Sequence, residues 1–344
     1  MNTTDEPQLS IVVLTYNRAC LLRQCLYSLI EQNIEARLVE IVVADDGSTD
    51  DTSRVVSEFM RKWPRLVYAR QPHKGIPATR NLGILNASAE LIAIVADDYV
   101  LAPDYVRTIL RFFKERPHAA IVRFKIVVYR EDIFSRISHF YYEMSFINRL
   151  LPPLEAKTSF EKFKFFFKRI TPPKPEITSK HDLEAAGAAA FRRSVFERVG
   201  LFDETLLRSE DTDYTRRLKA LGIPVYYNPF HRVRHQYAWG CLDTLQKNFT
   251  HGVNYYRLYR KYAQDSSVCR QMCDAVRELA NQFLRSLWRS RQVEHFGEFL
   301  LYFPALVAFE LAVKAGMGWG LLKSIALRKP PATQTLEIDQ KRNR

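Results

Sequence analysis

Pairs of adjacent carboxylates close two apolar stretches of this chain. Asp45 and Asp46 end the run VEIVVADD, and Asp97 and Asp98 end the run LIAIVADD. In a parallel sheet, ligands are held beyond the carboxyl ends of the strands, so both acid pairs would lie at the same edge. Carboxylates there can hold a divalent cation together with the phosphates of a ligand. The spacing therefore predicts a metal-assisted phosphate site.

The chain lacks the glycine-rich loops that usually bind phosphates. The turn after the first apolar run reads TYNRACLL, which contains no glycine, and no Gly-x-x-x-x-Gly-Lys-Ser/Thr sequence occurs anywhere. This excludes a dinucleotide fingerprint and a P-loop, because both need bare backbone close to the phosphates. The negative charge must be neutralised by other groups, which favours a cation held by the acids.

Alternating apolar runs and helical patterns position these acids. Near-continuous apolar strands followed by amphipathic helices predict an α/β fold, with a mainly parallel sheet and helices on both faces. Further along, we expect a helix capped by Ser194 and a helix that begins near Glu210. The expected strands are 9–16, 39–46, 66–70, 91–98, 119–129, 185–191 and 223–229.

Composition divides the chain into a front and a back part. The net charge of +13 lies almost entirely after residue 128. We expect a main domain at 1–240 with a basic, aromatic insertion at about 130–180. A helical region at 241–328 and a disordered polar tail at 329–344 would follow. A basic half indicates an anionic partner surface, with membrane phospholipid and nucleic acid as the two candidates.

Five cysteines without a Cys-x-x-Cys pair indicate reduced thiols rather than a disulfide framework or a zinc site. The first ten residues, MNTTDEPQLS, carry neither a basic n-region nor an apolar h-region, so we expect no secretory signal. Together these features predict a cytoplasmic protein.

Five motifs in order carry a resemblance to a known family. They are LSIVVLTYNR, VVADDGSTDDT, HKGIPATRNLGI, ADDYVLAPDYV and FDETLLRSEDTDYTRRL. Together they resemble the family 2 glycosyltransferases, over roughly residues 9–235. The resemblance implies a GT-A fold, which is Rossmann-like, and an inverting transfer from a nucleotide-diphosphate sugar. It implies a Mg²⁺ or Mn²⁺ cofactor. Processive members carry a Gln-x-x-Arg-Trp sequence, which is absent here, so a single-addition enzyme is favoured.

The resemblance also assigns a nucleotide pocket. Asp46 would accept a hydrogen bond from the base, since uracil N3 is a donor. Thr15, Tyr16 and Arg18 would line the same pocket. Arg80 would meet the base or the diphosphate, because its planar fork suits both; a solvated charge on a helix is the alternative.

Asp97 and Asp98 match the metal motif of the family. One acid would contact the ribose and the other the cation, and we assign Asp97 to the ribose and Asp98 to the metal. His235 would be a second metal ligand, because neutral imidazole can bind Mn²⁺. A structural histidine is an equal alternative for His235, and His231 lies four residues earlier.

Asp211 corresponds to the catalytic base, with Glu210 beside it. Inverting transfer needs one carboxylate to take the proton of the acceptor hydroxyl. Acids in a first helical turn also favour the helix dipole, so capping is the alternative for both residues.

The function predicted is transfer of a single sugar in glycan or glycolipid biosynthesis. The donor would be a UDP-sugar, with dTDP or GDP as alternatives, and the acceptor a glycan or lipid-linked hydroxyl. The rival is a non-catalytic GT-A-like protein that binds an anionic polymer or membrane surface. No nucleic acid partner is expected.

The segment FLLYFPALVAF is too short to span a bilayer, which takes about 20 apolar residues. It predicts either peripheral attachment to the cytoplasmic face of a membrane or a helical pair packed on the main domain.

Overall fold

The structure is a computed structural model of the whole chain of 344 residues. It describes residues 6–130, 132–133, 135–139, 177–181, 183, 187–236, 240–262 and 296–326. Most of the predicted insertion at 130–180 and all of the predicted tail at 329–344 lie outside the described residues.

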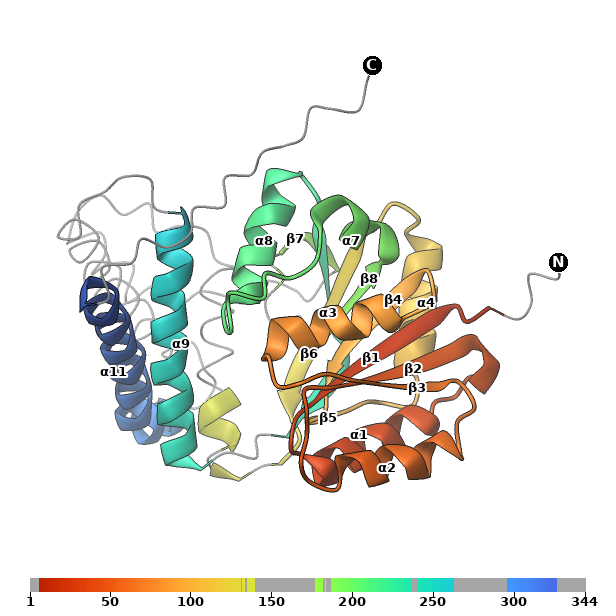
Figure 1. Cartoon of the computed structure of the whole chain (residues 1–344), viewed down its shortest axis with the longest axis horizontal. Helices are drawn as coiled ribbons and strands as arrows, with labels where there is room; N and C mark the ends of the chain where they lie inside the picture. Colours follow the sequence, from red (N-terminus) through yellow and green to blue (C-terminus); the bar gives the residue numbers. More distant parts are fainter. Residues whose placement is uncertain are drawn as a thin grey trace, which may run out of the picture.

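One mixed sheet forms the centre of the molecule (Figure 1). Its strands follow the order β3-β2-β1-β4-β8-β6-β9-β5, and β7 pairs with β9. The first four strands in the chain are parallel to one another, whereas β8 runs antiparallel to both β4 and β6. The strands are β1 (Leu9–Thr15), β2 (Val39–Asp45), β3 (Leu66–Arg70), β4 (Leu91–Ala96), β5 (Tyr99–Val100), β6 (Ile121–Val128), β7 (Thr178–His181), β8 (Ala188–Arg192) and β9 (Val225–His235).

Helices cover both faces of the sheet, as the sequence predicted. The face that includes Ile11 and Val43 packs against α1, α2 and α4, and the face that includes Val12 and Val42 packs against α3, α7 and α8. These helices are α1 (Ala19–Ile30), α2 (Thr52–Met60), α3 (Ile76–Asn86), α4 (Tyr105–Glu115), α7 (Arg193–Val199) and α8 (Glu210–Ala220), with a 3₁₀ turn at Ala36–Leu38.

The burial of β1 explains why apolar and polar residues do not alternate along its sequence. All seven residues of Leu9–Thr15 are buried, because β1 lies between two parallel strands and under helices on both sides. Its neighbour β4 is buried over five of six residues. Parallel strands of this kind are continuously apolar, and the polar residues that follow them are therefore exceptional.

Two expectations about local structure were wrong in detail. Ser194 does not cap α7, because the helix already begins at Arg193 and makes no side-chain cap hydrogen bond. The last strand does not end near residue 229 but continues as β9 to His235. Pairing with β6 over both halves of β9, across a register shift, extends the strand and carries His235 to the edge of the site.

Two long helices, α9 (Cys241–Tyr262) and α11 (Phe296–Ala326), stand beside the sheet domain (Figure 1). They pack on each other closely at two glycines. A Cβ on Gly252 would lie 1.8 Å from the carbonyl oxygen of Val313, and one on Gly316 would lie 1.9 Å from that of Phe249. Among the described helices, none is both long enough and apolar enough to cross a membrane. Both lie in the predicted helical region, whose boundary at residue 240 stays a prediction.

Candidate active site

Asp97 and Asp98 form the buried centre of the site, directly after β4. Thr15 Oγ1 donates to Asp97 Oδ2 at 2.8 Å, and Arg18 Nη1 lies 3.2 Å from Asp97 Oδ1 and 3.1 Å from Asp98 Oδ2. Parallel pairing of β1 with β4 brings residues so distant in sequence together. Burial raises the pKa of Asp97 to about 7, against the opposing effect of the Arg18 guanidinium. Thr15 and Arg18 thus contact the acid pair, and their predicted place in the base pocket stays a prediction.

The second acid has a different environment. His235 Nε2 lies 3.2 Å from Asp98 Oδ2, and the buried Oδ1 of Asp98 has no hydrogen-bond partner among the described residues. Burial alone would raise the pKa of Asp98, but His235, Arg18 and Lys247 outweigh it and hold the pKa below its usual range. The backbone of Gln236 donates to Asp98 O at 2.7 Å, which ties the end of β9 to the acid.

This donor set suits a divalent cation. An ionised carboxylate with one unpartnered oxygen and a neighbouring imidazole can supply two ligands, and Mg²⁺ or Mn²⁺ takes the rest from water and substrate phosphate. The described residues contain no group of three or more His, Cys, Asp or Glu side chains that could hold a metal by themselves. Asp98 and His235 are therefore the residues that could hold one jointly with a phosphate.

His231 belongs to the core and not to this centre. Its ring packs against Tyr105 and Phe124, with centroid distances of 5.6 and 5.5 Å, beneath α4. Its Nδ1 lies 3.4 Å from Thr108 Oγ1 and 3.8 Å from Asp104. Alternation along β9 places both His231 and His235 among buried residues. Only His235 reaches the acid pair.

Asp46 organises the loop between β3 and α3. Its carboxylate accepts hydrogen bonds from Gln71 Nε2 at 2.9 Å and from the backbone amides of Lys74 and Gly75 at 2.9 and 2.8 Å. His73 Nδ1 lies 2.7 Å from its Oδ2. Four donors fill the acceptor capacity of a carboxylate. A direct hydrogen bond to a nucleotide base would have to replace one of these partners, and the exposed His73 is the one that can move away.

A glycine makes this loop contact possible. Gly47 has φ of +85°, and a Cβ there would lie 2.9 Å from both Gln71 O and His73 N. Any residue other than glycine at position 47 would push the loop away from Asp46. On the outer side of the loop, the rings of Tyr16 and His73 stack at a centroid distance of 4.2 Å. The flat, half-exposed pair offers a stacking surface for a base. His73 opens the motif HKGIPATRNLGI but was not assigned a role, because its stacking partner Tyr16 lies far away in the sequence.

Arg80 and Glu210 form a buried ion pair that joins α3 to α8. Arg80 Nη1 bonds to Glu210 Oε1, both side chains are less than a tenth exposed, and the guanidinium lies 5.1 Å from the ring centroid of Phe202. Burial raises the pKa of Glu210, partly offset by Arg80. The charge of Arg80 is therefore engaged by Glu210. Sequence reasoning identified both residues and did not pair them, because 130 positions separate them.

Asp211 lies in the first turn of α8 and is half-buried. Its Oδ1 accepts a hydrogen bond from the backbone of Thr212 at 2.8 Å. A carboxylate in this position can act as a general base, and its place in the first helical turn also suits the helix dipole. Ser209, just before the helix, has φ of +68°, and its side chain makes no cap hydrogen bond.

A cation from the C-terminal helices completes the site. Lys247 of α9 lies within electrostatic range of Asp98, Arg18 and Arg208. Loss of hydration and the two arginines lower the pKa of its ammonium well below the usual value. Tyr99 interacts electrostatically with both Asp98 and Arg80, which connects the acid pair to the Arg80–Glu210 pair. Lys247 carried no signal in the sequence, because helix α9 is brought to the sheet only by tertiary packing.

The fold and site together define a class. A doubly wound sheet with acids at the carboxyl ends of β2 and β4, and a further acid opening α8, is the GT-A type of glycosyltransferase architecture. The chain belongs to glycosyl transferase family 2, whose model matches residues 10–200.

Individual relatives agree with this assignment. The chain is 32% identical over 240 residues to a validoxylamine A glucosyltransferase of Streptomyces hygroscopicus subsp. jinggangensis, which is 65% of this chain and 54% of that protein. It is 34% identical over 128 residues to the glycosyltransferase GlyA of Streptococcus pneumoniae, which is 37% of this chain and 16% of that protein. The chain thus matches about half or less of the length of these two relatives.

A solved structure has the same fold. The mannosyltransferase PcManGT from Pyrobaculum calidifontis, in complex with GDP-Man and Mn²⁺, superimposes with a TM-score of 0.53 at 18% identity. The alignment covers 94% of this chain and 79% of that one.

Proposed function

We propose that this protein is an inverting, metal-dependent glycosyltransferase that moves one sugar from a nucleotide-diphosphate donor to an acceptor hydroxyl. The observation that carries the proposal is the buried Asp97–Asp98 pair, in which Asp98 has one unpartnered oxygen and His235 at 3.2 Å from the other. A protein that only binds an anionic polymer or a membrane surface has no need of this acid pair together with a further acid at Asp211.

Asp98 and His235 would hold the cation. When bound, a divalent ion neutralises the diphosphate and so makes it a better leaving group. Arg18 supplies further positive charge beside Asp98, and Lys247 lies near the same acid. Preorganised cations stabilise charge that develops in the transition state without needing to move. Arg80 keeps its proposed contact with the base or the diphosphate while it is held by Glu210, and Arg18 and Lys247 are further candidates for contact with the diphosphate.

Asp211 would act as the general base. A half-buried carboxylate at the start of α8 can accept the proton of an acceptor hydroxyl that attacks the sugar from the side opposite the diphosphate. Its neighbour Glu210 holds Arg80 and so serves to position α8.

The donor pocket would lie between Tyr16, His73 and the loop held by Asp46. An aromatic pair provides stacking, and the carboxylate of Asp46 provides hydrogen bonding to the base once His73 moves. Asp97 keeps its role as the ribose contact, although Thr15 and Arg18 already occupy its oxygens. We propose a UDP-sugar as donor, with dTDP- and GDP-sugars as alternatives.

We further propose that the acceptor is a glycan or lipid-linked hydroxyl and that the protein associates with the cytoplasmic face of a membrane. Support comes from α11, which exposes Leu311, Trp319 and Leu322 by 64%, 55% and 60%. At 3.6 residues per turn these three lie on one face. The net charge of +13, concentrated after residue 128, is complementary to anionic headgroups.

The catalytic assignment is tested by Asp211→Asn. We would measure release of nucleoside diphosphate from UDP-glucose, UDP-N-acetylglucosamine and GDP-mannose with Mn²⁺, with water or an added sugar as acceptor. Loss of the base should lower turnover by about 10²- to 10⁴-fold, while the thermal shift produced by UDP and Mn²⁺ is retained. Asp51→Asn, at an exposed acid before α2, is the matched control. Wild-type turnover in Asp211→Asn would show that Asp211 is not the base.

The metal assignment is tested separately. Asp98→Asn and His235→Ala should each abolish most of the additional thermal shift that Mn²⁺ gives in the presence of UDP, because each removes one of two protein ligands. His231→Phe, four residues away in the core, should leave it unchanged. An undiminished Mn²⁺ effect in both site variants, or no effect of EDTA on wild-type turnover, would contradict the assignment.

A further inference from the structure

Asp213 is a buried acid that the proposed reaction does not use. It lies two residues after Asp211 on α8, and its side chain is fully buried. Two residues along a helix correspond to a rotation of about 200° and a rise of about 3 Å, so the two acids point to nearly opposite sides. Contacts that hold Asp213 therefore fix the side of α8 opposite to Asp211.

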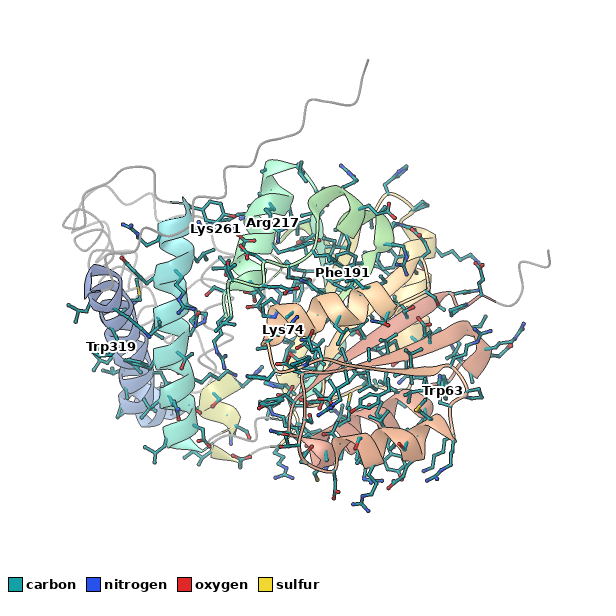
Figure 2. All side chains as sticks on the ribbon, in the orientation of Figure 1. Trp63, Lys74, Phe191, Arg217, Lys261 and Trp319 are labelled. Atoms are coloured by element: carbon teal, nitrogen blue, oxygen red, sulfur yellow. The ribbon has the colours of Figure 1, made fainter. Side chains whose placement is uncertain are left out.

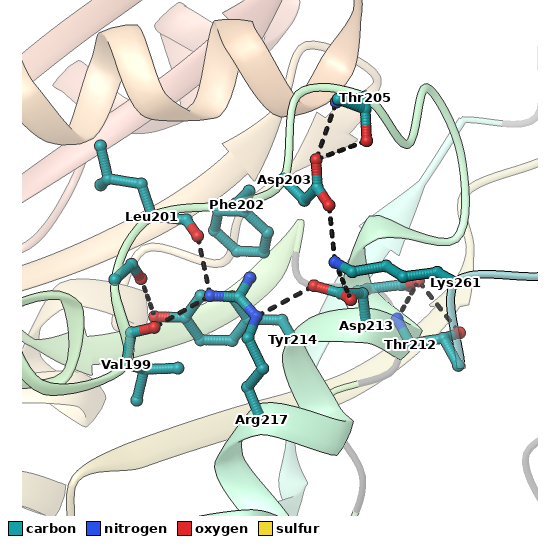
Figure 3. Close-up of polar contacts among 12 residues, drawn as sticks. Val199, Leu201, Phe202, Asp203, Thr205, Thr212, Asp213, Tyr214, Arg217 and Lys261 are labelled. Atoms are coloured by element: carbon teal, nitrogen blue, oxygen red, sulfur yellow. Dashed lines mark hydrogen bonds and ion pairs between the residues drawn. The ribbon is translucent and has the colours of Figure 1, made fainter. Parts of the chain in front are cut away.

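Helix α9 supplies the groups that hold Asp213 (Figure 3). Lys261 Nζ donates to Asp213 Oδ1 at 2.7 Å, and Tyr262 OH donates to the same oxygen at 2.6 Å. Arg217, one turn later on α8, donates to Oδ2 at 2.9 Å. Three donors on one carboxylate compensate for the loss of hydration at a fully buried position. Figure 2 shows Lys261 and Arg217 where the ends of α9 and α8 meet.

Lys261 also binds the loop that precedes α8. Its Nζ donates to Asp203 Oδ2 at 2.6 Å, so one ammonium bridges Asp203 and Asp213. Burial alone would raise the pKa of Asp203, but the bonds from Lys261 and Thr205 outweigh it and lower the pKa. Arg217 Nη1 donates at 2.9 Å to the backbone carbonyls of Val199, the last residue of α7, and of Leu201 in the same loop. The loop, α8 and α9 are thus cross-linked by charged hydrogen bonds.

The cross-links continue to the pair that anchors Asp211. Phe202, in the middle of this loop, stacks on Tyr214 of α8 at a centroid distance of 4.4 Å. Asn81 of α3 exchanges hydrogen bonds of 2.9 Å with the backbone N–H and C=O of Phe202. The neighbouring Arg80 binds Glu210, directly before Asp211. The first turn of α8 is therefore held from two sides, by α3 through Glu210 and by α9 through Asp213.

The ordinary interpretation of these contacts is stability alone. Two features go beyond it. The contacts from α3 and from α9 both reach the first turn of α8, at Glu210 and Asp213, on either side of the proposed base. The α9 contacts also come from two consecutive residues, Lys261 and Tyr262, at the C-terminal end of the helix. The N-terminal half of the same helix carries Lys247, which lies near Asp98. One helix therefore reaches both the diphosphate end and the base end of the site.

We propose that Lys261 and Tyr262 are positioning residues for glycosyl transfer, which through Asp213 set the placement of Asp211 against the donor. The inference rests on the proposed function. It makes the α9–α11 pair part of the catalytic unit rather than an attachment to it. Misplacement of a reacting group by about 1 Å can cost about 10²-fold in rate, so the loss of these contacts should appear in turnover more than in donor binding.

The test compares kcat and donor KM for nucleoside diphosphate release from the nucleotide sugar that wild type uses best among UDP-glucose, UDP-N-acetylglucosamine and GDP-mannose. Lys261→Met and Tyr262→Phe should each lower kcat by about tenfold or more, with the donor KM within about twofold of wild type. Lys261→Arg keeps the cation and should recover much of the loss. Arg257→Met is the matched control, since Arg257 donates to Asn254 on α9 itself.

The outcomes separate the two proposals. A wild type that turns over none of the donors contradicts the proposed function, whatever the variants do. If wild type is active and kcat is unchanged in both Lys261→Met and Tyr262→Phe, the positioning role is wrong. It is also wrong if the whole loss of kcat/KM in these variants comes from a higher donor KM. If Lys261→Met does not fold, Tyr262→Phe, which removes a single hydroxyl, decides. A further check is Asp213→Asn combined with Tyr262→Phe, whose effects on kcat should be clearly less than additive.

Discussion

At the scale of single residues, the acids of this protein are distinguished by what surrounds each carboxylate. Asp46 has four donors, all from the loop it holds, and Asp213 has three donors from α8 and α9. Asp98 keeps one buried oxygen without a partner among the described residues. A buried, ionised oxygen of that kind is costly and is therefore a marker of a ligand site. Exposure and sequence context alone do not separate these three acids.

His231 gives a prediction about pH at this scale. Burial lowers the pKa of His231, and Asp104 at 3.8 Å offsets this only in part. In the unfolded chain, histidine titrates near pH 6.5, so below about that pH the unfolded state binds a proton at this position more readily than the folded state does. The His231 contribution is therefore absent above the unfolded pKa and destabilising as the pH falls below it.

We expect the free energy of unfolding of wild type to fall more steeply between pH 7.5 and pH 5.5 than that of His231→Phe, measured by urea titration at both pH values. Substitution of the exposed His118 by Gln should leave the wild-type dependence in place. Parallel pH dependences in wild type and His231→Phe would show that His231 is not held neutral by its surroundings.

At the scale of elements, the contact between α9 and α11 is set by glycine. Gly252 and Gly316 each lie against a backbone carbonyl of the other helix, so the two helices approach as closely as their main chains allow. Gly316, Gly318 and Gly320 follow each other in α11, but a Cβ on Gly318 would meet nothing within 4 Å. The three glycines therefore have different roles, although their local sequence is nearly the same.

Gly316→Ala should destabilise the protein by about 1–3 kcal/mol, because the added methyl group must separate α9 from α11. Gly318→Ala is the control on the same helix and should instead stabilise it by about 0.5–1 kcal/mol, through the better helix propensity of alanine. Both changes in the free energy of unfolding can be read from denaturant titrations. The packing described here would be wrong if the two substitutions had the same sign.

At the scale of the whole molecule, α11 lies on the side away from β1–β3 (Figure 1) and exposes Leu311, Trp319 and Leu322. Trp319 stands on this outer side (Figure 2). An orientation with α11 on a membrane would leave the nucleotide end of the site, at β1 and β2, open to the solvent that carries the donor. It would bring α9, and with it Lys247 and Lys261, toward the side from which a lipid-linked acceptor arrives.

The double variant Trp319→Glu/Leu322→Glu should reduce binding to vesicles of phosphatidylglycerol and phosphatidylcholine by at least about tenfold, because each apolar side chain contributes about 1.5–3 kcal/mol when fully buried. Leu85→Glu, at a residue 69% exposed on α3, is the control and should bind as wild type does. Co-sedimentation measures both. Equal binding by the double variant and wild type would remove α11 from the proposed membrane surface.

Much of the site could be predicted from the sequence because it lies in short motifs. The acids of VEIVVADD and LIAIVADD follow strands whose apolar character reveals them, and Asp211 opens a helix with a recognisable acidic turn. His235 could be named but not separated from His231, since both alternate inward along β9. Lys247, Lys261 and Tyr262 could not be found, because their importance depends on partners contributed by β4 and α8.

The sequence by itself determined the fold class and the family and pointed to the candidate acids, because each of these depends on local patterns: hydrophobic periodicity, turn residues and the order of motifs. Only the tertiary structure decided the state of each group, since this depends on donors from distant segments and on exclusion of water. In the structure, Arg80 pairs with Glu210 and Arg18 contacts Asp97. Gln71 donates to the carboxylate of Asp46, and Lys261 of α9 donates to Asp213. Charges in a folded protein take their properties from neighbours in space, and those neighbours are set by packing.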